Sequence, residues 1–451
     1  MIHPARIRTL NEMPYRRGKC VVYWMQQSQR VEFNHALTYA IEQANTLGLP
    51  LLVFFALNDC FPEANVRHYH FMLTGLAETR TALYRRGIRM VVMHCDPPKG
   101  IASFAKHASI VVTDRGYLRI QKEWRRKAAE LLHCPLIQIE SDVIVPVAEA
   151  SPKEEYSAAT IRLKLHKRFV EFFTDFKTPR VKKDSLSFEN NGIDLSDPAA
   201  LCKRLAIDHS VVPVYWIRSG EKAAGEMLES FIEKKLDHFQ ELRNDPSLDY
   251  LSNMSPYLHF GQISPFKIAQ KIIASGSKST EIFLEELFVR RELAMNFVNY
   301  NASYDTFDCL PAWCRKTLLE HSLDVREYHY TKKQLEHAKT HDPCWNAAQN
   351  QLVITGKMHG YMRMYWGKKL LEWSPHPEKA FDIALWLNNK YSIDGRDPNG
   401  FTGVAWCFGK HDRAWSERAI FGKIRYMNEN GLRRKFQIDE YIRRVGEAGK
   451  K

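Results

Sequence analysis

Five short apolar runs in the first third of the chain constrain its fold more than any other feature. Each run is rich in β-branched or aromatic side chains, and they lie at residues 20–25, 49–57, 89–94, 109–114 and 135–141. The segments between them have the periodicity of helices, at residues 31–47, 64–86 and 117–133. Strands that alternate with helices in this way form a parallel sheet with helices on both faces. The sequence therefore predicts an α/β domain over residues 1–173.

No phosphate-binding glycine loop follows the first of these runs. Neither the GxGxxG pattern of dinucleotide-binding sheets nor a Walker A loop is present, so the sheet is not an obvious dinucleotide or ATP site. Ligands of open α/β sheets bind beyond the carboxyl ends of the strands. These ends lie near Met25–Arg30 and Ala56–Asp59, where we expect any ligand of this domain.

The pattern changes from about Thr174 onward. Residues 174–218 are polar and rich in turn formers, which predicts an interdomain linker. From Ser219 nearly every segment has helical periodicity, so residues 219–451 are predicted to form an all-helical domain. Its expected helices lie at 219–242, 264–275, 279–300, 331–340, 345–354, 357–372, 377–390 and 415–428.

Charge and cysteine content narrow the class of protein. The net charge of +13 favours a polyanionic partner, because bound cations release counterions from it, although an ordinary basic protein is an equal alternative. The nine scattered cysteines have no zinc-type spacing, and their odd number fits a reducing cytosol better than a disulfide framework. We see neither a signal peptide nor an apolar stretch long enough to span a membrane, and we expect a cytoplasmic protein with no metal.

One predicted helix, residues 357–373, mixes residue types that rarely share a helix. Gly360, Arg363 and Met364 lie within one third of its circumference, and two tryptophans form the adjacent stripe. Glycine leaves room for a group to approach the backbone, so one flank offers a gap, a cation and a thioether. The alternative is a tightly packed core helix whose arginine pairs with a buried carboxylate such as Asp394.

Three further clusters have two interpretations each. The run LSNMS, residues 251–255, suits a phosphate at a helix N-terminus or a simple helix cap. Glu286, in the apolar stretch 283–293, is either a carboxylic acid with a raised pKa or the partner of Arg290 one helical turn later. The tail, residues 410–451, interleaves basic and aromatic residues, as nucleic-acid faces and solvated helices both do.

In this order behind a βαβ domain, the clusters resemble one family, the photolyase/cryptochrome flavoproteins, and specifically class II cyclobutane pyrimidine dimer photolyases. The matching stretches are ELRNDP, LSNMSPYLHFGQISP, EELFVRREL, KMHGYMRMYWGKKLLEW, DGRDPNGFTGVAW and KHDRAWSERAIFGKIRYM. The resemblance covers both domains and implies a Rossmann-like antenna domain followed by a helical domain that holds FAD. It also implies light-driven repair, in which reduced, anionic FAD donates an electron to a dimer flipped out of UV-damaged DNA.

The resemblance also assigns cofactor contacts. Leu251 to Ser255 match the family's phosphate-binding turn, and Arg363 and Asp394 match an ion pair beside the isoalloxazine. Asn388 matches the asparagine that faces flavin N5 in class II enzymes, which makes it a catalytic candidate as well. The expected FAD contacts are Phe239, Arg243, Asn244, Leu251, Ser252, Asn253, Met254, Ser255, Arg363, Asn388, Asp394 and Gly395.

Substrate contacts follow from the same resemblance. Glu286 matches the glutamate that hydrogen-bonds the dimer, and Trp406 matches the tryptophan that packs against it. Gly360 and Met364 stand where six-four photolyases carry two histidines, which favours cyclobutane dimers. Two basic residues of the tail match residues that hold the DNA, so the expected substrate and DNA contacts are Glu286, Gly360, Met364, Trp406, Arg413 and Arg425.

Three tryptophans match the class II electron relay that photoreduces the flavin: Trp345, Trp366 and Trp373. Closely spaced indoles, which are readily oxidised, let a hole move toward solvent. The resemblance leaves the antenna chromophore open between a deazaflavin, a folate and none, and a monomer is the family's expectation. The alternative functions are a cryptochrome-like FAD photoreceptor without repair activity, which retention of Glu286 and Trp406 disfavours, and a colourless DNA-binding protein without cofactor.

Overall fold

A six-stranded sheet forms the N-terminal part of the molecule. The computed structural model describes residues 2–189 and 191–449. The strand order is β1-β6-β5-β2-β3-β4, with β1 antiparallel to β6 and every other pair parallel. The strands are β1 (Ile7–Thr9), β2 (Cys20–Trp24), β3 (Leu51–Leu57), β4 (Arg89–His94), β5 (Ala108–Asp114) and β6 (Leu136–Ile139). The five predicted strands are confirmed, and β1 is an additional short edge strand.

Helices cover both faces of the sheet, as predicted, because alternate side chains of each strand point to opposite faces. Val21 and Tyr23 of β2 pack in the core cluster that holds side chains of α1 and α2. Val22 and Trp24 pack instead with side chains of α3 and α4. This two-sided burial explains why the strands read as continuous apolar runs. The helices are α1 (His35–Leu47), α2 (Val66–Tyr84), α3 (Pro97–Phe104) and α4 (Arg119–Leu131).

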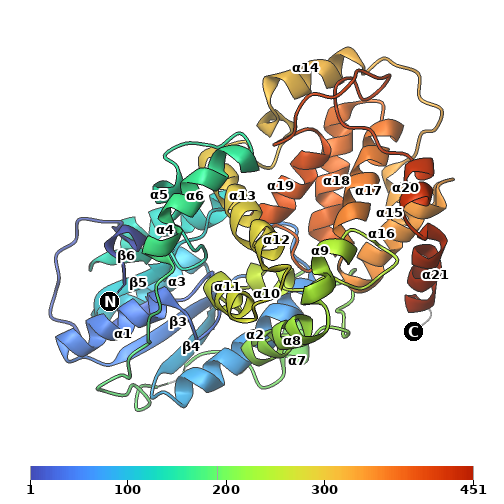
Figure 1. The fold of residues 1–451 in the computed structure, drawn as a ribbon. Helices are drawn as coiled ribbons and strands as arrows, with labels where there is room; N and C mark the ends of the chain where they lie inside the picture. Colours follow the sequence, from blue (N-terminus) through green and yellow to red (C-terminus); the bar gives the residue numbers. More distant parts are fainter. Residues whose placement is uncertain (1, 190, 450–451) are drawn as a thin grey trace.

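The second part of the molecule is helical; in Figure 1 it extends from α8 and α11, to the right of the sheet, up to α14 at the top of the view. Its largest core cluster surrounds α17, which packs against α16, α18 and α19. In the described part of the chain, no helix is both long and apolar enough to cross a bilayer. The helices after the sheet are α5 (Val147–Ala150), α6 (Ala158–Phe172), α7 (Pro198–Arg204), α8 (Glu221–Lys234), α9 (Phe239–Leu242), α10 (Ser255–His259), α11 (Pro265–Ala274), α12 (Thr280–Leu284), α13 (Arg291–Tyr300), α14 (Ala312–Glu320), α15 (Lys332–Glu336), α16 (Pro343–Thr355), α17 (Gly360–Trp373), α18 (Pro377–Tyr391), α19 (Pro398–Cys407), α20 (Glu429–Lys435) and α21 (Ile438–Ala448).

Three segments differ most from the expected secondary structure, and the helix predicted at 219–242 is also divided, into α8 and α9. The segment predicted as a linker contains α7, which packs on α2 and buries Leu201 in the sheet's core. The helix predicted at 415–428 is wrong: Ile420 and Gly422 have positive φ of 68° and 51°, and the Arg418 N–H donates to the Gly422 carbonyl in a turn. The helix predicted at 279–300 is interrupted by a π-helical turn, η4 (Glu285–Arg290).

Buried arginines join the sheet and the helical part. Arg291 of α13 pairs with Asp142, after β6, at 2.9 Å, and both side chains are almost fully buried. Arg30, after β2, donates to the Gly261 carbonyl at 2.9 Å. Burial raises the pKa of Asp142 to about 6 although two guanidinium groups oppose this. Charges buried in this way need such partners, so the contacts hold the carboxyl ends of the strands against the helical part.

Candidate functional site

The first turns of α17 form one wall of the candidate site. Arg363 donates a short hydrogen bond through Nη1 to Oδ1 of Asn388, which is buried in α18. The Met364 sulfur lies 3.8 Å from the Cys407 sulfur of α19. A Cβ added to Gly360 would meet no described atom within 4 Å. The predicted gap, cation and thioether therefore lie on one face, beside open space.

Asp394 lies in the turn between α18 and α19 and accepts a hydrogen bond from the Ser392 hydroxyl at 2.5 Å. Burial raises the pKa of this carboxyl, but the nearby Lys357 and Arg363 cations outweigh burial and lower it below its ordinary value. Within residues 2–189 and 191–449, no ion pair joins Arg363 directly to Asp394. The expected pairing is therefore wrong in its geometry, because the amide of Asn388 takes the guanidinium instead.

The turn at residues 251–255 lies beside a cation that sequence reasoning missed. Lys357 donates through Nζ to Oδ1 of Asn253 at 3.1 Å. Asn253 has a left-handed backbone, with φ of 57°, which asparagine tolerates better than most residues. Met254 is buried, and Ser255 begins α10. Hydroxyl, amide and ammonium groups are thereby gathered at one turn.

Other expected cofactor residues have different environments. Phe239 is buried at the start of α9, with its ring 5.6 Å from Phe231 and 5.4 Å from Phe283. Asn244 is exposed at the surface two residues after α9 ends. A Cβ on Gly395 would lie 2.9 Å from the Asn388 carbonyl oxygen. Gly395 therefore permits a close backbone approach, and Phe239 is a core residue in this geometry.

The π-helical turn η4 gives two neighbouring glutamates different arginine partners, although Arg290, 3.7 Å from Glu285, lies near both. Glu285 makes a bidentate ion pair with Arg162 of α6, at 2.7 and 3.0 Å. Glu286 accepts from Arg243 at 2.6 Å and lies 3.4 Å from Arg290. π-Helical turns are frequent at functional sites. The interpretation of Glu286 as an acid in an apolar pocket is wrong, since its side chain is 38% exposed and faces two guanidinium groups.

Trp406 of α19 lies beside Arg290, the same arginine that faces Glu286. The Arg290 guanidinium lies 5.2 Å from the centre of the Trp406 ring, within cation–π distance. Trp406 is partly exposed, whereas the neighbouring Ala405 and Cys407 are buried. Glu286, Arg290 and Trp406 thus form a continuous polar and aromatic surface.

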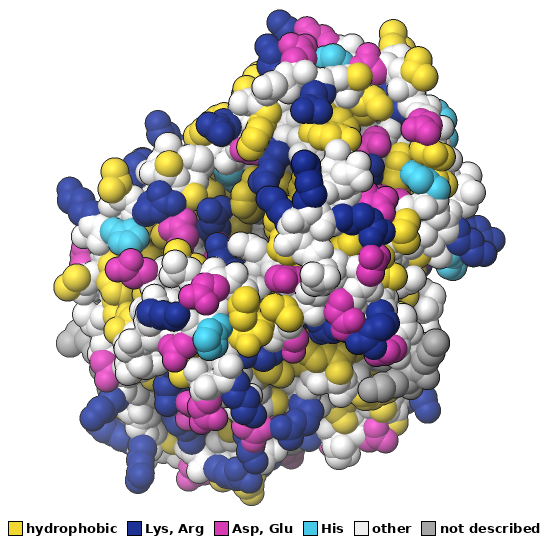
Figure 2. Space-filling view, turned by 45° about the vertical axis from the view of Figure 1, so that its right-hand side comes forward, with side chains coloured by type: hydrophobic (Ala, Val, Ile, Leu, Met, Phe, Trp, Pro, Cys, Tyr) yellow, Lys and Arg dark blue, Asp and Glu magenta, His cyan; other side chains and the backbone are white. Residues whose placement is uncertain are grey.

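The loop after α19 gathers basic residues around one indole. Arg413 lies 5.1 Å and Arg425 5.4 Å from the centre of the Trp415 ring. The turn at 418–422, not a helix, brings these two arginines together. Figure 2 shows Lys and Arg side chains spread over one face of the molecule, with a group near the centre of its upper half.

Three tryptophans in the helical core are in contact. The rings of Trp345 and Trp366 are stacked at 6.4 Å between centroids with 6° between planes. The Trp373 ring lies 5.4 Å from Trp345 at 67°. All three are buried. The Trp366 indole N–H donates to Gln349, and that of Trp345 donates to the Trp366 carbonyl, which fixes the two stacked rings.

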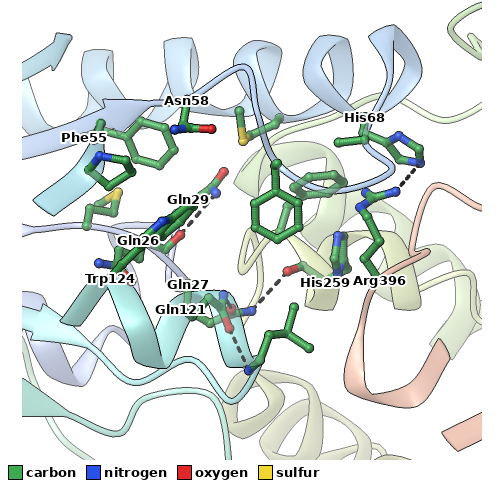
Figure 3. A pocket seen from close by; sticks show the side chains of 18 of the residues that line it. Gln26, Gln27, Gln29, Phe55, Asn58, His68, Gln121, Trp124, His259 and Arg396 are labelled. Atoms are coloured by element: carbon green, nitrogen blue, oxygen red, sulfur yellow. Dashed lines mark hydrogen bonds between the residues drawn. The ribbon is translucent and has the colours of Figure 1, made fainter. Parts of the chain in front are cut away.

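A cavity lies at the carboxyl ends of β2 and β3, where the sequence predicted a ligand (Figure 3). Its walls include amide and aromatic side chains: Gln26, Gln27, Gln29, Phe55, Asn58, Gln121 and Trp124. Both side-chain polar atoms of Gln26 and Oε1 of Gln29 are buried without any hydrogen-bond partner in the described structure. Buried polar atoms are ordinarily satisfied, so these amides are free to bind a ligand.

The helical part supplies the other wall of this cavity, which periodicity could not predict. His259, at the end of α10, pairs with Asp397 at 3.2 Å, and its carbonyl accepts from Gln27 at 3.1 Å. Arg396 contacts the ring of His68 at 2.9 Å. Arg396 and Asp397 directly follow Gly395, so the cavity and the α17–α18 site share one loop.

Comparison with known proteins identifies the family to which this chain belongs. A family model described as DNA photolyase matches residues 21–180. A deoxyribodipyrimidine photo-lyase of Methanothermobacter thermautotrophicus is 55% identical over 446 residues, which cover 99% of each chain. The chain belongs to the photolyase/cryptochrome family. Another member, a deoxyribodipyrimidine photo-lyase of Potorous tridactylus, is 41% identical, over 96% of this chain and 82% of that protein.

Solved structures of the family share the fold. A bacterial class III photolyase from Agrobacterium tumefaciens superimposes with a TM-score of 0.72 at 18% identity, over 95% of this chain and 86% of that one. A cryptochrome from Synechocystis gives 0.72 at 15% identity, over 94% of this chain and 88% of that one. The α/β part followed by a helical part is therefore the family's architecture.

Proposed function

We propose that this chain is a light-dependent deoxyribodipyrimidine photo-lyase of class II, which binds UV-damaged DNA and splits cyclobutane pyrimidine dimers with reduced FAD. Relatives between 41% and 55% identical over nearly the whole chain carry the name of this enzyme. The observation that carries the proposal is that α19 links two groups: Gly403 lies against Arg363, which pairs with Asn388, and one turn later Trp406 lies beside Arg290, which faces Glu286.

The donor set fits FAD. A diphosphate is bound by hydroxyl, amide and cationic groups, and the turn 251–255 with Lys357 supplies all three. Arg363 and Asn388 offer a cation and an amide to a flat ring system, and Gly360, one turn before Arg363, leaves open space beside them for the dimer. We assign the diphosphate to this turn and the flavin ring to the Arg363–Asn388 face. When bound, reduced FAD supplies the photoexcited electron that splits the dimer.

The chain's own residues set the electrostatics of that face. The charges of Arg363 and Lys357 favour a negative charge held between them. The hydrogen bond from Arg363 to Oδ1 of Asn388 fixes the amide, so that Nδ2 lies toward Gly400 of α19 and donates to Oδ1 of Asn389 at 3.3 Å. Asn388, placed on α18, and the three tryptophans of α16 and α17 support class II within the family.

The carboxylate–aromatic surface suits a flipped dimer. Arg243 and Arg290 hold the Glu286 carboxylate at the mouth of the site, where it accepts hydrogen bonds from pyrimidine N–H or exocyclic donors. Trp406 offers a face for stacking. The basic pair Arg413 and Arg425 is suited to backbone phosphates, which position DNA without reading its sequence.

We further propose that residues 1–173 are the antenna domain, 219–451 the FAD domain and 174–218 their connection. The cavity of Figure 3, with its aromatic walls and unpaired amides, suits a planar antenna chromophore such as a deazaflavin or a folate. All nine cysteines are free, which supports a reducing compartment such as the cytoplasm.

An absorption spectrum and a repair assay test the proposal together. The purified protein is expected to be coloured, and it should restore thymine-dimer oligonucleotides under blue light with a reductant, but not in the dark. FAD-loaded protein that leaves such dimers intact would contradict the proposal and favour a photoreceptor. A colourless protein that binds no added FAD would contradict it as well.

A further inference from the structure

The three contacting tryptophans do not reach the protein surface. Trp373, the outermost of them, is only 2% exposed, and its indole N–H has no acceptor among the described residues. Two other rings lie against it on the solvent side: Tyr330 at 5.1 Å and 75°, and His341 at 5.5 Å and 64°. The aromatic contacts therefore continue outward from Trp373.

A hydrogen bond joins the phenol oxygen of Tyr330 to the ring of His341. The Tyr330 oxygen lies 2.5 Å from Nδ1 of His341 and accepts the backbone N–H of the same histidine at 3.0 Å. Because the phenol oxygen already accepts that N–H, its own proton is available to point at Nδ1. The His341 side chain is exposed and stacks on Tyr328 at 3.6 Å. The phenol thus has a proton acceptor with direct access to water.

The positive charge near Trp373 disfavours a long-lived radical cation on its indole ring. The Lys369 ammonium lies 5.8 Å from the centre of its ring and is almost fully buried. A cation at this distance disfavours further positive charge on the indole, although Glu372, paired with Lys369 at 2.9 Å, offsets part of this effect. A neutral radical on a neighbouring group is not subject to that repulsion.

We propose that Tyr330 and His341 form a proton-coupled terminus of the tryptophan relay, an inference that rests on the proposed photoreduction role of the tryptophans. A radical cation at Trp373 is the oxidant, and it takes one electron from Tyr330. The phenol O–H bond breaks and the proton moves to Nδ1 of His341. The products are a neutral indole, a neutral phenoxyl radical and an imidazolium, which passes a proton to water. The oxidised site thereby moves from the buried tryptophans to Tyr330, nearer to solvent.

Transient absorption and electron paramagnetic resonance after a light flash test this assignment in the flavin-loaded protein. In the wild type, the tryptophanyl signal should give way to a neutral tyrosyl signal, and this step should slow in D2O. Tyr330→Phe should abolish the tyrosyl signal and prolong the tryptophanyl signal severalfold. His341→Ala should slow tyrosyl formation severalfold, with rescue by added imidazole. Tyr328→Phe, which keeps the stacked ring but removes a hydroxyl, should match the wild type.

Two outcomes separate this proposal from the one on which it rests. If a tryptophanyl signal forms but decays identically in the wild type and Tyr330→Phe with no tyrosyl signal, the terminus is wrong. If no tryptophanyl signal forms, the proposed photoreduction through the tryptophans is wrong. Tyr330 and His341 are then tested with an oxidant that does not depend on photoexcited flavin. A ruthenium polypyridyl sensitiser with a sacrificial acceptor then supplies the oxidant. A tyrosyl component that disappears in Tyr330→Phe supports the terminus, whereas identical signals overturn it.

Discussion

Arg363 of α17 donates its hydrogen bond to the side-chain oxygen of Asn388 in α18, and not to the carboxylate of Asp394. The amide is buried and so depends on this donor, while Asp394 has the Ser392 hydroxyl and the Lys357 charge nearby. One guanidinium therefore orients the amide and contributes charge to the face.

Replacing Arg363 should weaken both the fold and flavin binding. Arg363→Met leaves the Asn388 oxygen without its donor, which should lower the free energy of unfolding by about 1–3 kcal/mol. Chemical denaturation and the flavin-to-protein ratio measure the two effects. Arg126→Met, on the exposed surface of α4, is the control and should change neither; an equal loss in both variants would contradict the role of Arg363.

Of the two glutamates of η4, we expect Glu286 to affect the repair rate and Glu285 to affect stability. Glu286→Gln should slow single-turnover repair by about tenfold or more, since a hydrogen bond to a charged group contributes about 1.5–3 kcal/mol. Glu285→Gln breaks the ion pair with Arg162 and should reduce stability while sparing the repair rate. The assay uses chemically reduced enzyme under saturating light. A slower rate in Glu285→Gln than in Glu286→Gln would reverse the assignment.

His359 should make α17 sensitive to acid. It caps the helix through Nδ1, which accepts the Tyr361 N–H, and burial lowers its pKa from 6.5 to about 4. The unfolded chain binds the proton more readily in this window, so stability is full above pH 6.5 and falls as pH drops toward 4, by about 3 kcal/mol. His359→Asn keeps a cap without titrating. The difference in stability between the two proteins should therefore change with pH over this range; parallel curves would refute the idea.

Substitution by alanine should destabilise the protein at Gly395 but not at Gly360. Gly395→Ala places a Cβ 2.9 Å from backbone atoms of Asn388 and Asn389, and such overpacking costs about 1–3 kcal/mol. Gly360→Ala meets open space and should leave the thermal midpoint unchanged while weakening binding of dimer-containing DNA, because it fills the gap. Thermal denaturation and a binding titration distinguish the two. Unaltered DNA affinity in Gly360→Ala would place the dimer elsewhere.

The arginines beside Trp415 should act on phosphates. Removing either Arg413 or Arg425 should reduce the slope of log affinity against log salt by about 0.9 for each phosphate that the variant no longer neutralises. Fluorescence anisotropy at several salt concentrations measures the slope with damaged and undamaged duplexes. Arg443→Ala, on α21 and paired with Glu440, is the matched control. A slope equal to that of the wild type in both site variants would show that these arginines do not contact the DNA phosphates.

Local periodicity predicted the elements wherever burial was regular. The run at 109–114 became β5 because a central parallel strand is covered on both faces, and the helical pattern at 357–372 became α17. Periodicity failed where single residues or distant partners decide the backbone. Ile420 and Gly422 adopt positive φ in a turn that pairs with itself, and η4 gains a residue in its turn as Glu285 reaches Arg162 on α6.

The sequence by itself determined the α/β part, the helical part and, through its ordered motifs, the family. Tertiary structure alone decided which oxygen Arg363 binds, how Glu285 and Glu286 diverge, and that His259 and Arg396 complete a cavity begun by Gln27. The physical reason is the separation along the chain between the residues that interact. Apolar periodicity reports burial within one element, whereas Gln27 and His259 are 232 residues apart and meet only because the helical part packs on the carboxyl ends of the strands.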